Sequence, residues 1–334
     1  MNRPFLPTAA TALCDPKGRL NPDAVGWSQQ PLIDCRLPGN TWRRKRWNHW
    51  CIITPDWTLS LLQADLDYAG YGAAYFADLH TGQSVSYSQL NLLARGCSLP
   101  DTPEGSHAFE HPDLKLHFNE HPGRVRLTAL GASIDGRSLQ LALDIQRPAH
   151  LGSVNLVAPL GGNCFHATCR QVGLPASGSV QWGDREYTCR PGQSFASMDF
   201  GRGVWPYRSH WTRAAFAAPG GIAGNFGSGW TDHSGLSENA LWFGGDLQHL
   251  DQPVHIRQEH DQLLSPWQVR SDDERVDLHF VPRYRYAVKP RLGLFYNHIQ
   301  LWFGHYHGML LGPAGERVPV SGADGWLGNA KAFW

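Results

Sequence analysis

The sequence carries little charge and no excess of either sign. Only 17% of its 334 residues are charged, and 29 Lys and Arg balance 29 Asp and Glu. Nucleic-acid-binding proteins usually present a strongly basic face, so nucleic acid is not an expected partner. The one basic cluster, Arg43–Arg46, is short and runs into an aromatic segment. We expect it to be a solvated turn, with a contact to phosphate or membrane as the alternative.

Long apolar runs are also missing. Prolines and a threonine interrupt the stretch Met1–Gly18, unlike the continuous apolar region of a signal peptide. No later stretch supplies the ~18 uncharged apolar residues of a spanning helix. The sequence therefore predicts a cytoplasmic protein without an integral membrane segment.

The usual motifs of cofactor and metal chemistry are absent. The seven cysteines include no Cys-x-x-Cys pair, which argues against a zinc cage and a disulfide framework. There is no Gly-rich phosphate loop, Gly-x-Ser-x-Gly elbow or His-Glu-x-x-His motif. Nucleotide use, common serine hydrolysis and zincin chemistry are therefore disfavoured, and no cofactor or resident metal is expected.

Short alternating segments separated by turn residues dominate the chain. Leu114–Phe118, Val125–Thr128 and Leu139–Ile145 alternate apolar and polar residues, and turn residues lie between them. These three segments predict an antiparallel meander. Helical signals are confined to short pieces such as Pro22–Ser28 and Pro191–Ala196.

The sequence therefore predicts an all-β protein with two barrel-like or sandwiched lobes, because closed sheets avoid exposed edges. Leu151–Gly178 is rich in Gly and Pro and interrupts the strand pattern, so the join is expected near it. The predicted lobes are residues 1–160 and 161–334.

Aromatic residues and acids gather on Gly-rich segments of the second half. The chain has 14 Trp and 17 His, and the densest runs are Met198–Tyr207 and Asn225–Asn239. Glycines beside acids, Arg and Trp allow a backbone to turn sharply and approach a ligand. The predicted catalytic residues are Asp199, Asp232, Glu238, Tyr207 and His305, and the predicted substrate-binding residues are Trp50, Arg202, Trp205, Trp211, Asn225, Trp230 and Asn239.

Each of these assignments has a structural alternative. A Trp in a strand is more often a core residue than a ligand contact. Asp199 could cap a turn and pair with Arg202, while Asp232 and Glu238 could stabilise turns. Asp65 and Asp67 could share a face and raise one carboxyl pKa, although a solvated turn is favoured.

Several blocks together resemble the domain-of-unknown-function 2804 (DUF2804) family over nearly the whole chain. The blocks are Leu13–Gly18, Lys45–Ile52, Asp65–Gly70, Met198–Tyr207, Gly229–Asp232, Ser237–Trp242 and Phe303–His305. The family is distantly similar to lipocalin-like two-lobed proteins that include carotenoid 1,2-hydratases and some cyclisation catalysts. The resemblance implies two lipocalin-like β-lobes and an apolar ligand, although a fold does not determine a function.

Three functions are consistent with these observations. The first is a cofactor-independent hydratase, hydro-lyase, isomerase or cyclase that acts on an apolar, isoprenoid- or lipid-like molecule in a Trp-lined pocket. Asp199 or Asp232 would be the acid, Arg202 would set its pKa, and Tyr207 and His305 would orient or relay protons. The alternatives are a non-catalytic carrier of a lipid-like ligand and a glycoside-active enzyme with paired carboxylates. No oligomeric state is predicted.

The chain is expected to need no added metal for any activity it has. His305 and His307 would share a face of a strand, as a metal pair requires, but their spacing identifies no third ligand. Activity should therefore survive dialysis against a chelator. Loss of activity with the chelator and its return with zinc or iron would instead make both histidines metal ligands.

Overall fold

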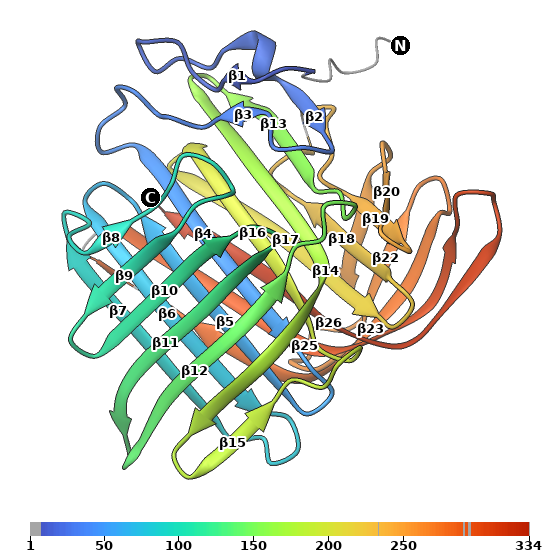
Figure 1. The fold of residues 1–334 in the computed structure, drawn as a ribbon. Helices are drawn as coiled ribbons and strands as arrows, with labels where there is room; N and C mark the ends of the chain where they lie inside the picture. The colour runs from blue at the N-terminus through green and yellow to red at the C-terminus, as the bar shows by residue number, and fades with distance from the viewer. Residues whose placement is uncertain (1–7, 233, 290, 293–294, 334) are drawn as a thin grey trace. The chain divides into compact units, whose positions relative to one another are not determined.

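The computed structural model describes residues 8–232, 234–289, 291–292 and 295–333. Strands form nearly all of its regular structure, and Figure 1 shows them in two extended, strongly curved sheets. The all-β fold predicted from the alternating sequence is confirmed. No helix among the described residues is long and apolar enough to cross a membrane.

The first sheet contains 14 strands in the described part of the chain. Its main path runs β7-β6-β5-β4-β16-β14-β12-β11-β10-β9-β8, and β13, β15 and β2 attach beside it. The strands are β2 (Gly26–Ser28), β4 (Arg44–Ile53), β5 (Trp57–Asp65), β6 (Ala69–Asp78), β7 (Ser84–Leu92), β8 (Cys97–Ser98), β9 (His107–His111), β10 (Leu114–His121), β11 (Arg124–Ile134), β12 (Arg137–Gln146), β13 (Val154–Gly161), β14 (Cys164–Trp182), β15 (Arg185–Thr188) and β16 (Phe195–Val204).

The second sheet contains ten strands in the described residues and follows the path β20-β19-β18-β17-β26-β25-β23-β22-β21, with β24 beside β25. Its strands are β17 (Arg208–Ala218), β18 (Ile222–Ser228), β19 (Ala240–Phe243), β20 (Asp246–His249), β21 (Val254–Gln258), β22 (Trp267–Ser271), β23 (Val276–Val288), β24 (Arg291–Leu292), β25 (Phe295–Leu311) and β26 (Arg317–Phe333). A separate parallel pair, β1 (Thr11–Ala12) and β3 (Ile33–Asp34), lies near the 3₁₀ turn η1 (Pro22–Ala24).

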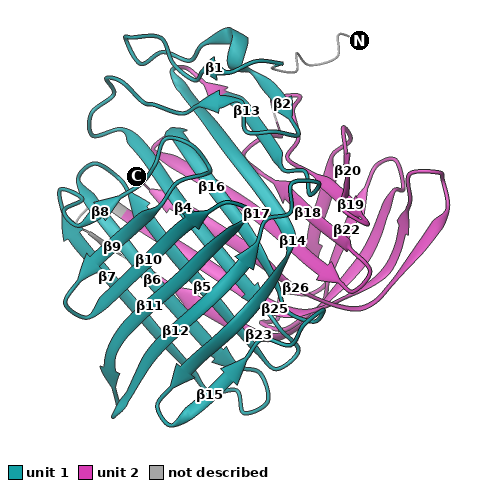
Figure 2. Cartoon of the chain, viewed as in Figure 1, with its two compact units in different colours: residues 1–159, 163–204 teal, residues 160–162, 205–334 magenta. Residues whose placement is uncertain are grey.

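The chain divides into two compact units, shown in Figure 2. One comprises residues 1–159 and 163–204, and the other comprises residues 160–162 and 205–334. This division differs from the predicted ranges 1–160 and 161–334. The Gly- and Pro-rich segment 151–178 contributes to β13 and the long strand β14, and a register shift between Gln171 and Leu174 accommodates its irregular part.

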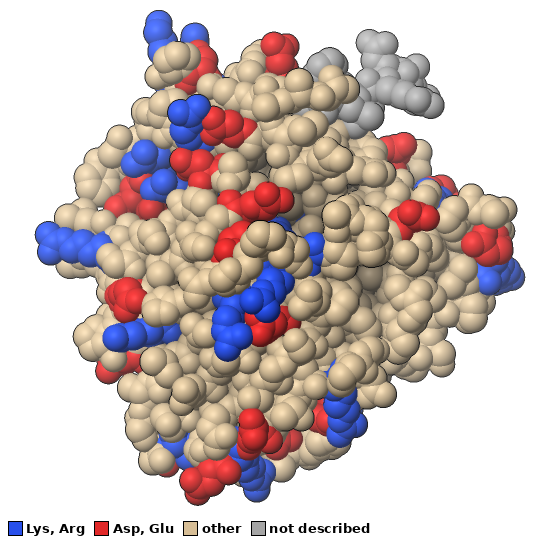
Figure 3. All heavy atoms as spheres, viewed as in Figure 1, with Lys and Arg blue, Asp and Glu red and all other residues tan. Residues whose placement is uncertain are grey.

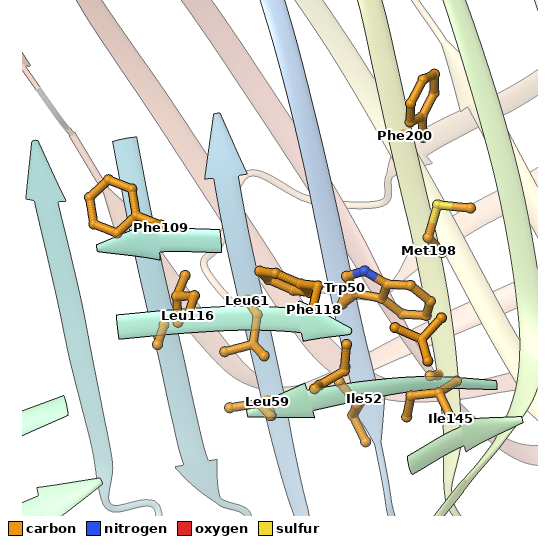
Figure 4. Close-up of a cluster of buried hydrophobic side chains, with 14 of the residues drawn as sticks. Trp50, Ile52, Leu59, Leu61, Phe109, Leu116, Phe118, Ile145, Met198 and Phe200 are labelled. Carbon is orange, nitrogen blue, oxygen red and sulfur yellow. The ribbon is translucent and has the colours of Figure 1, made fainter. Parts of the chain in front are cut away.

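The core of the first unit lies inside its curled sheet. Figure 4 shows β9 and β10 crossing over the strands of the opposite side, with large apolar side chains between the two layers. The labelled side chains are Trp50, Ile52, Leu59, Leu61, Phe109, Leu116, Phe118, Ile145, Met198 and Phe200. All ten belong to the same buried cluster, so apolar burial holds the curled sheet together.

A short polar chain also crosses this interior. Gln63 on β5 contacts His107 Nδ1 at 2.8 Å, and Asn48 on β4 contacts His107 Nε2 at 3.0 Å. Burial lowers the pKa of His107 to about 3, so its ring is neutral in the folded protein at ordinary pH. These contacts join β4 and β5 to β9 and satisfy polar groups that would be costly to bury alone.

The predicted meander is confirmed as β10, β11 and β12, which pair antiparallel in that order. The predicted turn at Gly183 joins β14 to β15. The helical prediction for Pro22–Ser28 was correct only for the turn at Pro22–Ala24, and the segment Pro191–Ala196 is a turn leading into β16.

Charged side chains lie scattered over the visible face of the molecule in Figure 3, with both signs close together.

The basic cluster Arg43–Arg46 differs from the solvated turn that we expected. Instead of forming a solvated turn, Arg44–Arg46 begin strand β4, and Lys45 is 2% exposed.

Gly72 on β6 is required by close packing. A Cβ at this position would overlap the ring of Phe109, which lies across the backbone of β6. Gly72→Ala is therefore expected to lower the free energy of unfolding by about 1–3 kcal/mol. A double-mutant cycle with Phe109→Leu, followed by urea unfolding, tests the contact. The two effects should be strongly non-additive, since the smaller side chain gives the new methyl room; additive effects would contradict this packing.

Candidate functional site

Strand β16 presents different chemistry on its two faces. Asp199 stands directly opposite His49 on β4 and Arg170 on β14. Directly opposed residues of neighbouring strands share a face, so these three side chains form one row. The flanking residues Met198 and Phe200 point to the other face, where they enter the core.

Asp199 is held as a buried anion. Its Oδ1 forms an ion pair with Arg170 Nη1 and also accepts a hydrogen bond of 3.0 Å from Trp47 Nε1. The two charged side chains are 9% and 2% exposed. An adjacent cation and a hydrogen-bond donor both favour the ionised form of a carboxyl group. Breaking such a pair by removing one partner leaves a buried charge uncompensated.

Gly201 makes room for Trp47 across β16. A Cβ on Gly201 would overlap the Trp47 ring, so only glycine allows the indole to lie over the strand. The same ring stacks on His166 of β14, with centroids 4.9 Å apart. Gly201 therefore has a packing role in a regular strand and does not provide the sharp turn that we expected from the sequence.

Two histidines beside Asp199 stay neutral. Burial, and secondarily the Arg170 guanidinium, lowers the pKa of His49 to about 4. The same two causes, in the same order, hold the pKa of the buried His166 well below its ordinary value. His49 Nε2 is also 2.8 Å from Ser60 Oγ on β5. Each neutral imidazole keeps one nitrogen that can accept a proton or hydrogen bond.

Lys45 extends this row of groups toward the start of β4. Lys45, Trp47 and His49 alternate along the strand and therefore share a face. The Lys45 ammonium lies 4.8 Å from the ring centroid of Tyr68, and burial lowers the pKa of Lys45 to about 8. The face thus carries an anion, two neutral imidazoles, a guanidinium and an amine that loses its proton more easily than an ordinary lysine.

Arg202 does not pair with Asp199, contrary to the expectation from their closeness in sequence. Three positions apart on an extended strand, the two side chains point to opposite faces. The Arg202 guanidinium donates to the backbone oxygens of Pro100, Trp47 and Gly201 and to Asn48 Oδ1, at 2.7–3.1 Å. Burial lowers the pKa of Arg202 to about 9. The cation that pairs with the Asp199 carboxylate is therefore Arg170.

The second unit has its own buried carboxyl group. Glu238 is 0% exposed, and its Oε1 accepts a hydrogen bond of 2.8 Å from Trp230 Nε1. Arg213 Nε on β17 lies 3.9 Å from the same oxygen. Asn225 donates to the Glu238 backbone oxygen, and Asn239 Oδ1 accepts from the Gly227 amide. The predicted residues Glu238, Trp230, Asn225 and Asn239 thus gather in one cluster.

The other predicted residues of this unit have different surroundings. Asp232 is exposed and accepts a hydrogen bond from the Gly229 amide, which is the turn-stabilising contact considered from the sequence. Trp205 packs against Trp211 and Trp230, with centroids 5.5 and 5.9 Å apart. Tyr207 is 47% exposed. His305 Nδ1 lies 2.9 Å from Asp324 Oδ1 on β26.

Three further residues considered from the sequence belong to the first unit but not to the Asp199 row. Trp50 lies in the apolar core in Figure 4. Asp65 and Asp67 do not repel each other as an uncompensated pair, because Arg46 contacts Asp65 at 2.5 Å and Arg44 contacts Asp67 at 2.7 Å. Among the described residues, no group of three or more His, Cys, Asp or Glu side chains could hold a metal ion.

Sequence reasoning missed the partners of Asp199. Arg170 and His166 lie in the segment that we interpreted as an interruption, and Lys45 lies in the cluster interpreted as a turn. A signal was present, because Phe165–Arg170 alternates apolar residues with His166, Thr168 and Arg170. That period identifies a strand with one polar face. The strand register that brings Arg170 to Asp199 has no comparable local signal.

Comparisons with known proteins support the fold. A family model described as Domain of unknown function (DUF2804) matches residues 7–334, and no curated protein matches the chain. A candidate AttH from Nitrosomonas europaea is similar in structure, with 12% identity, a TM-score of 0.50, and coverage of 87% of this chain and 93% of that one. Kievitone hydratase from Nectria haematococca gives 11% identity, a TM-score of 0.47, and coverage of 88% and 90%. At these identities the likeness concerns the fold alone.

The neutral state of His49 predicts a pH dependence of stability. The unfolded chain binds this proton near pH 6.5 and the folded chain near pH 4, so stability should fall as pH decreases through this window. One pKa unit corresponds to about 1.4 kcal/mol, which gives His49 a share of at most about 3 kcal/mol. Urea unfolding of wild type and His49→Gln between pH 7 and about 4 tests this. Equal slopes for both proteins would contradict the assignment.

Proposed function

The chain belongs to the DUF2804 family, and from this premise we propose that it is an acid–base enzyme acting on an apolar or partly apolar small molecule. The family name records no activity, so the proposal rests on the groups around Asp199. The observation that carries it is a buried carboxylate with its own cation, set beside two neutral imidazoles on one sheet face. This combination suits the movement of protons.

Asp199 is proposed as a general base. Arg170 and the Trp47 indole keep its carboxylate ionised, which is the state needed to accept a proton from carbon or from water. This differs from the general-acid role expected from the sequence, in which Arg202 would set the pKa of Asp199. The guanidinium beside the base would also stabilise negative charge that develops on a substrate oxygen during proton removal.

The neighbouring residues would complete the proton pathway. His49, held by Ser60, and His166, held by its stack on Trp47, are neutral, so each ring could pass a proton on without remaining charged beside Arg170. Hydration, elimination, isomerisation and cyclisation of an apolar molecule all move a proton to or from carbon. We therefore propose this group of reactions on an α,β-unsaturated carbonyl compound or its hydrate, in which a carboxylate base can remove a proton from water or from the carbon next to the carbonyl group.

Glu238 in the second unit is a separate candidate for the same type of chemistry. Like Asp199, Glu238 is buried, accepts a hydrogen bond from an indole and lies near a guanidinium. Burial of a carboxyl group with directed donors is costly and is frequent at functional sites. The same assay, applied to Glu238→Gln, distinguishes its contribution from that of Asp199.

The proposed chemistry predicts deuterium incorporation at carbon. Incubation of the protein in D₂O with a panel of α,β-unsaturated carbonyl compounds and their hydrates, followed by mass spectrometry, detects the reactions of this group in which the transferred proton exchanges with solvent. Asp199→Asn is expected to lower the exchange rate per folded molecule by about 10²–10⁴. The measurement should be made below the melting temperature of the variant, since loss of the ion pair could cost ~3–5 kcal/mol.

Asp65→Asn is the matched control. Asp65 is also buried and paired with an arginine in the same sheet, but it stands opposite Arg46 and therefore points to the face opposite Asp199. It should lose stability while it keeps exchange activity per folded molecule. If Asp199→Asn behaved in the same way, Asp199 would be a structural ion-pair residue. Binding of panel compounds by the wild type without any exchange would favour the carrier alternative.

A further inference from the structure

Four large apolar side chains are exposed at one end of the first unit. They are Trp42, Leu90, Leu92 and Leu93, which are 55%, 36%, 66% and 55% exposed. We call this set the apolar tip. The segments that carry Trp42 and Leu90–Leu93 both contact the turn between β5 and β6. The Trp42 amide donates to Asp67 Oδ2 at 2.8 Å, and the Leu93 amide donates to the Tyr68 backbone oxygen at 3.0 Å.

The backbone of the apolar tip is strained. Trp42 has φ 72°, Leu93 has φ 57° and Ala94 has φ 51°, in the left-handed region that favours glycine and asparagine. Bulky residues persist in this region where the surrounding structure enforces it, and such strain concentrates at functional sites. Here the Asp67 carboxylate fixes the turn through Arg44 at 2.7 Å.

The chain segments that form the apolar tip and the turn between them carry more basic than acidic residues, although the whole chain has no net charge and Asp101 from a neighbouring segment also acts on Arg44. Segments 40–46, 65–69 and 90–97 contain five basic and two acidic residues. Both acids, Asp65 and Asp67, are buried in ion pairs with arginines. Arg43 and Arg95 are exposed beside the apolar residues. The nearest acid on β9, Glu110, contacts His117.

We propose that the apolar tip docks on an anionic lipid surface. Trp and Leu would enter the boundary between headgroups and acyl chains, and Arg43 and Arg95 would contact the negatively charged headgroups. The apolar area is divided between the turn at Trp42 and the end of strand β7, which is little for a stable protein interface of roughly 1,200–2,000 Å². Short insertion at a membrane surface needs no such continuous area.

This inference extends the proposed function but does not depend on it. An apolar substrate would partition into membranes, so a docking tip would bring the protein to its source. The contact itself involves none of the groups around Asp199. Its test is a binding measurement, and its failure would therefore leave the exchange assay unaffected.

The decisive variant is Trp42→Asn/Leu93→Asn. Asparagine tolerates positive φ, so the variant should melt at least as high as the wild type while it loses the apolar contact. Co-sedimentation with phosphatidylcholine vesicles containing phosphatidylserine should show binding of the wild type and a loss of about tenfold or more for the variant. Arg43→Gln/Arg95→Gln should lose only the binding that phosphatidylserine adds, and this part should weaken with salt.

The control is Leu263→Ser/Leu264→Ser. These residues are 65% and 49% exposed in the second unit, in a loop that also contains Glu259 and Asp261, so their replacement should leave vesicle binding unchanged. Wild-type protein that does not sediment with anionic vesicles, or an Asn variant that binds as the wild type does, would overturn the proposal. So would a dimer in sedimentation velocity that the Asn variant abolishes, because the apolar tip would then bind a second copy of the chain.

Discussion

The buried ion pair between Asp199 and Arg170 is the interaction on which the candidate site depends. A carboxylate and a guanidinium removed from water need each other, because either charge alone would be strongly destabilising. The pair also contributes to the state of its neighbours. Burial is the main cause of the lowered pKa values of His49 and His166, and the Arg170 guanidinium lowers both further, so both rings are held neutral.

The pair requires a specific strand register. Arg170 reaches Asp199 because β14 and β16 place them directly opposite each other, and His49 completes the row from β4. A shift of one residue would send Asp199 into the apolar core and Met198 to the site face. The core contacts of Met198 and Phe200 therefore hold the register that the polar face uses. Stability and site geometry are linked through one strand.

Backbone geometry restricts the choice of residue in two different ways in the first unit. At Gly201 the missing side chain lets Trp47 lie over β16 and reach both Asp199 and His166. At the apolar tip, Trp42 and Leu93 occupy backbone conformations in which glycine would be less strained. The first provides space for a side chain inside the fold. The second is backbone strain at exposed residues.

The sequence by itself determined the fold class and many of the strands, because alternation with period two is a local property. From composition and spacing it also identified candidate site residues, namely Asp199, Glu238, Trp230, Asn225 and Asn239. It did not determine their partners: Arg202 looked close to Asp199 in sequence, yet alternation sends it to the other face. Only the tertiary structure decided that Arg170 pairs with Asp199 and that Lys45 is buried, because strand register and burial depend on segments far apart in the chain.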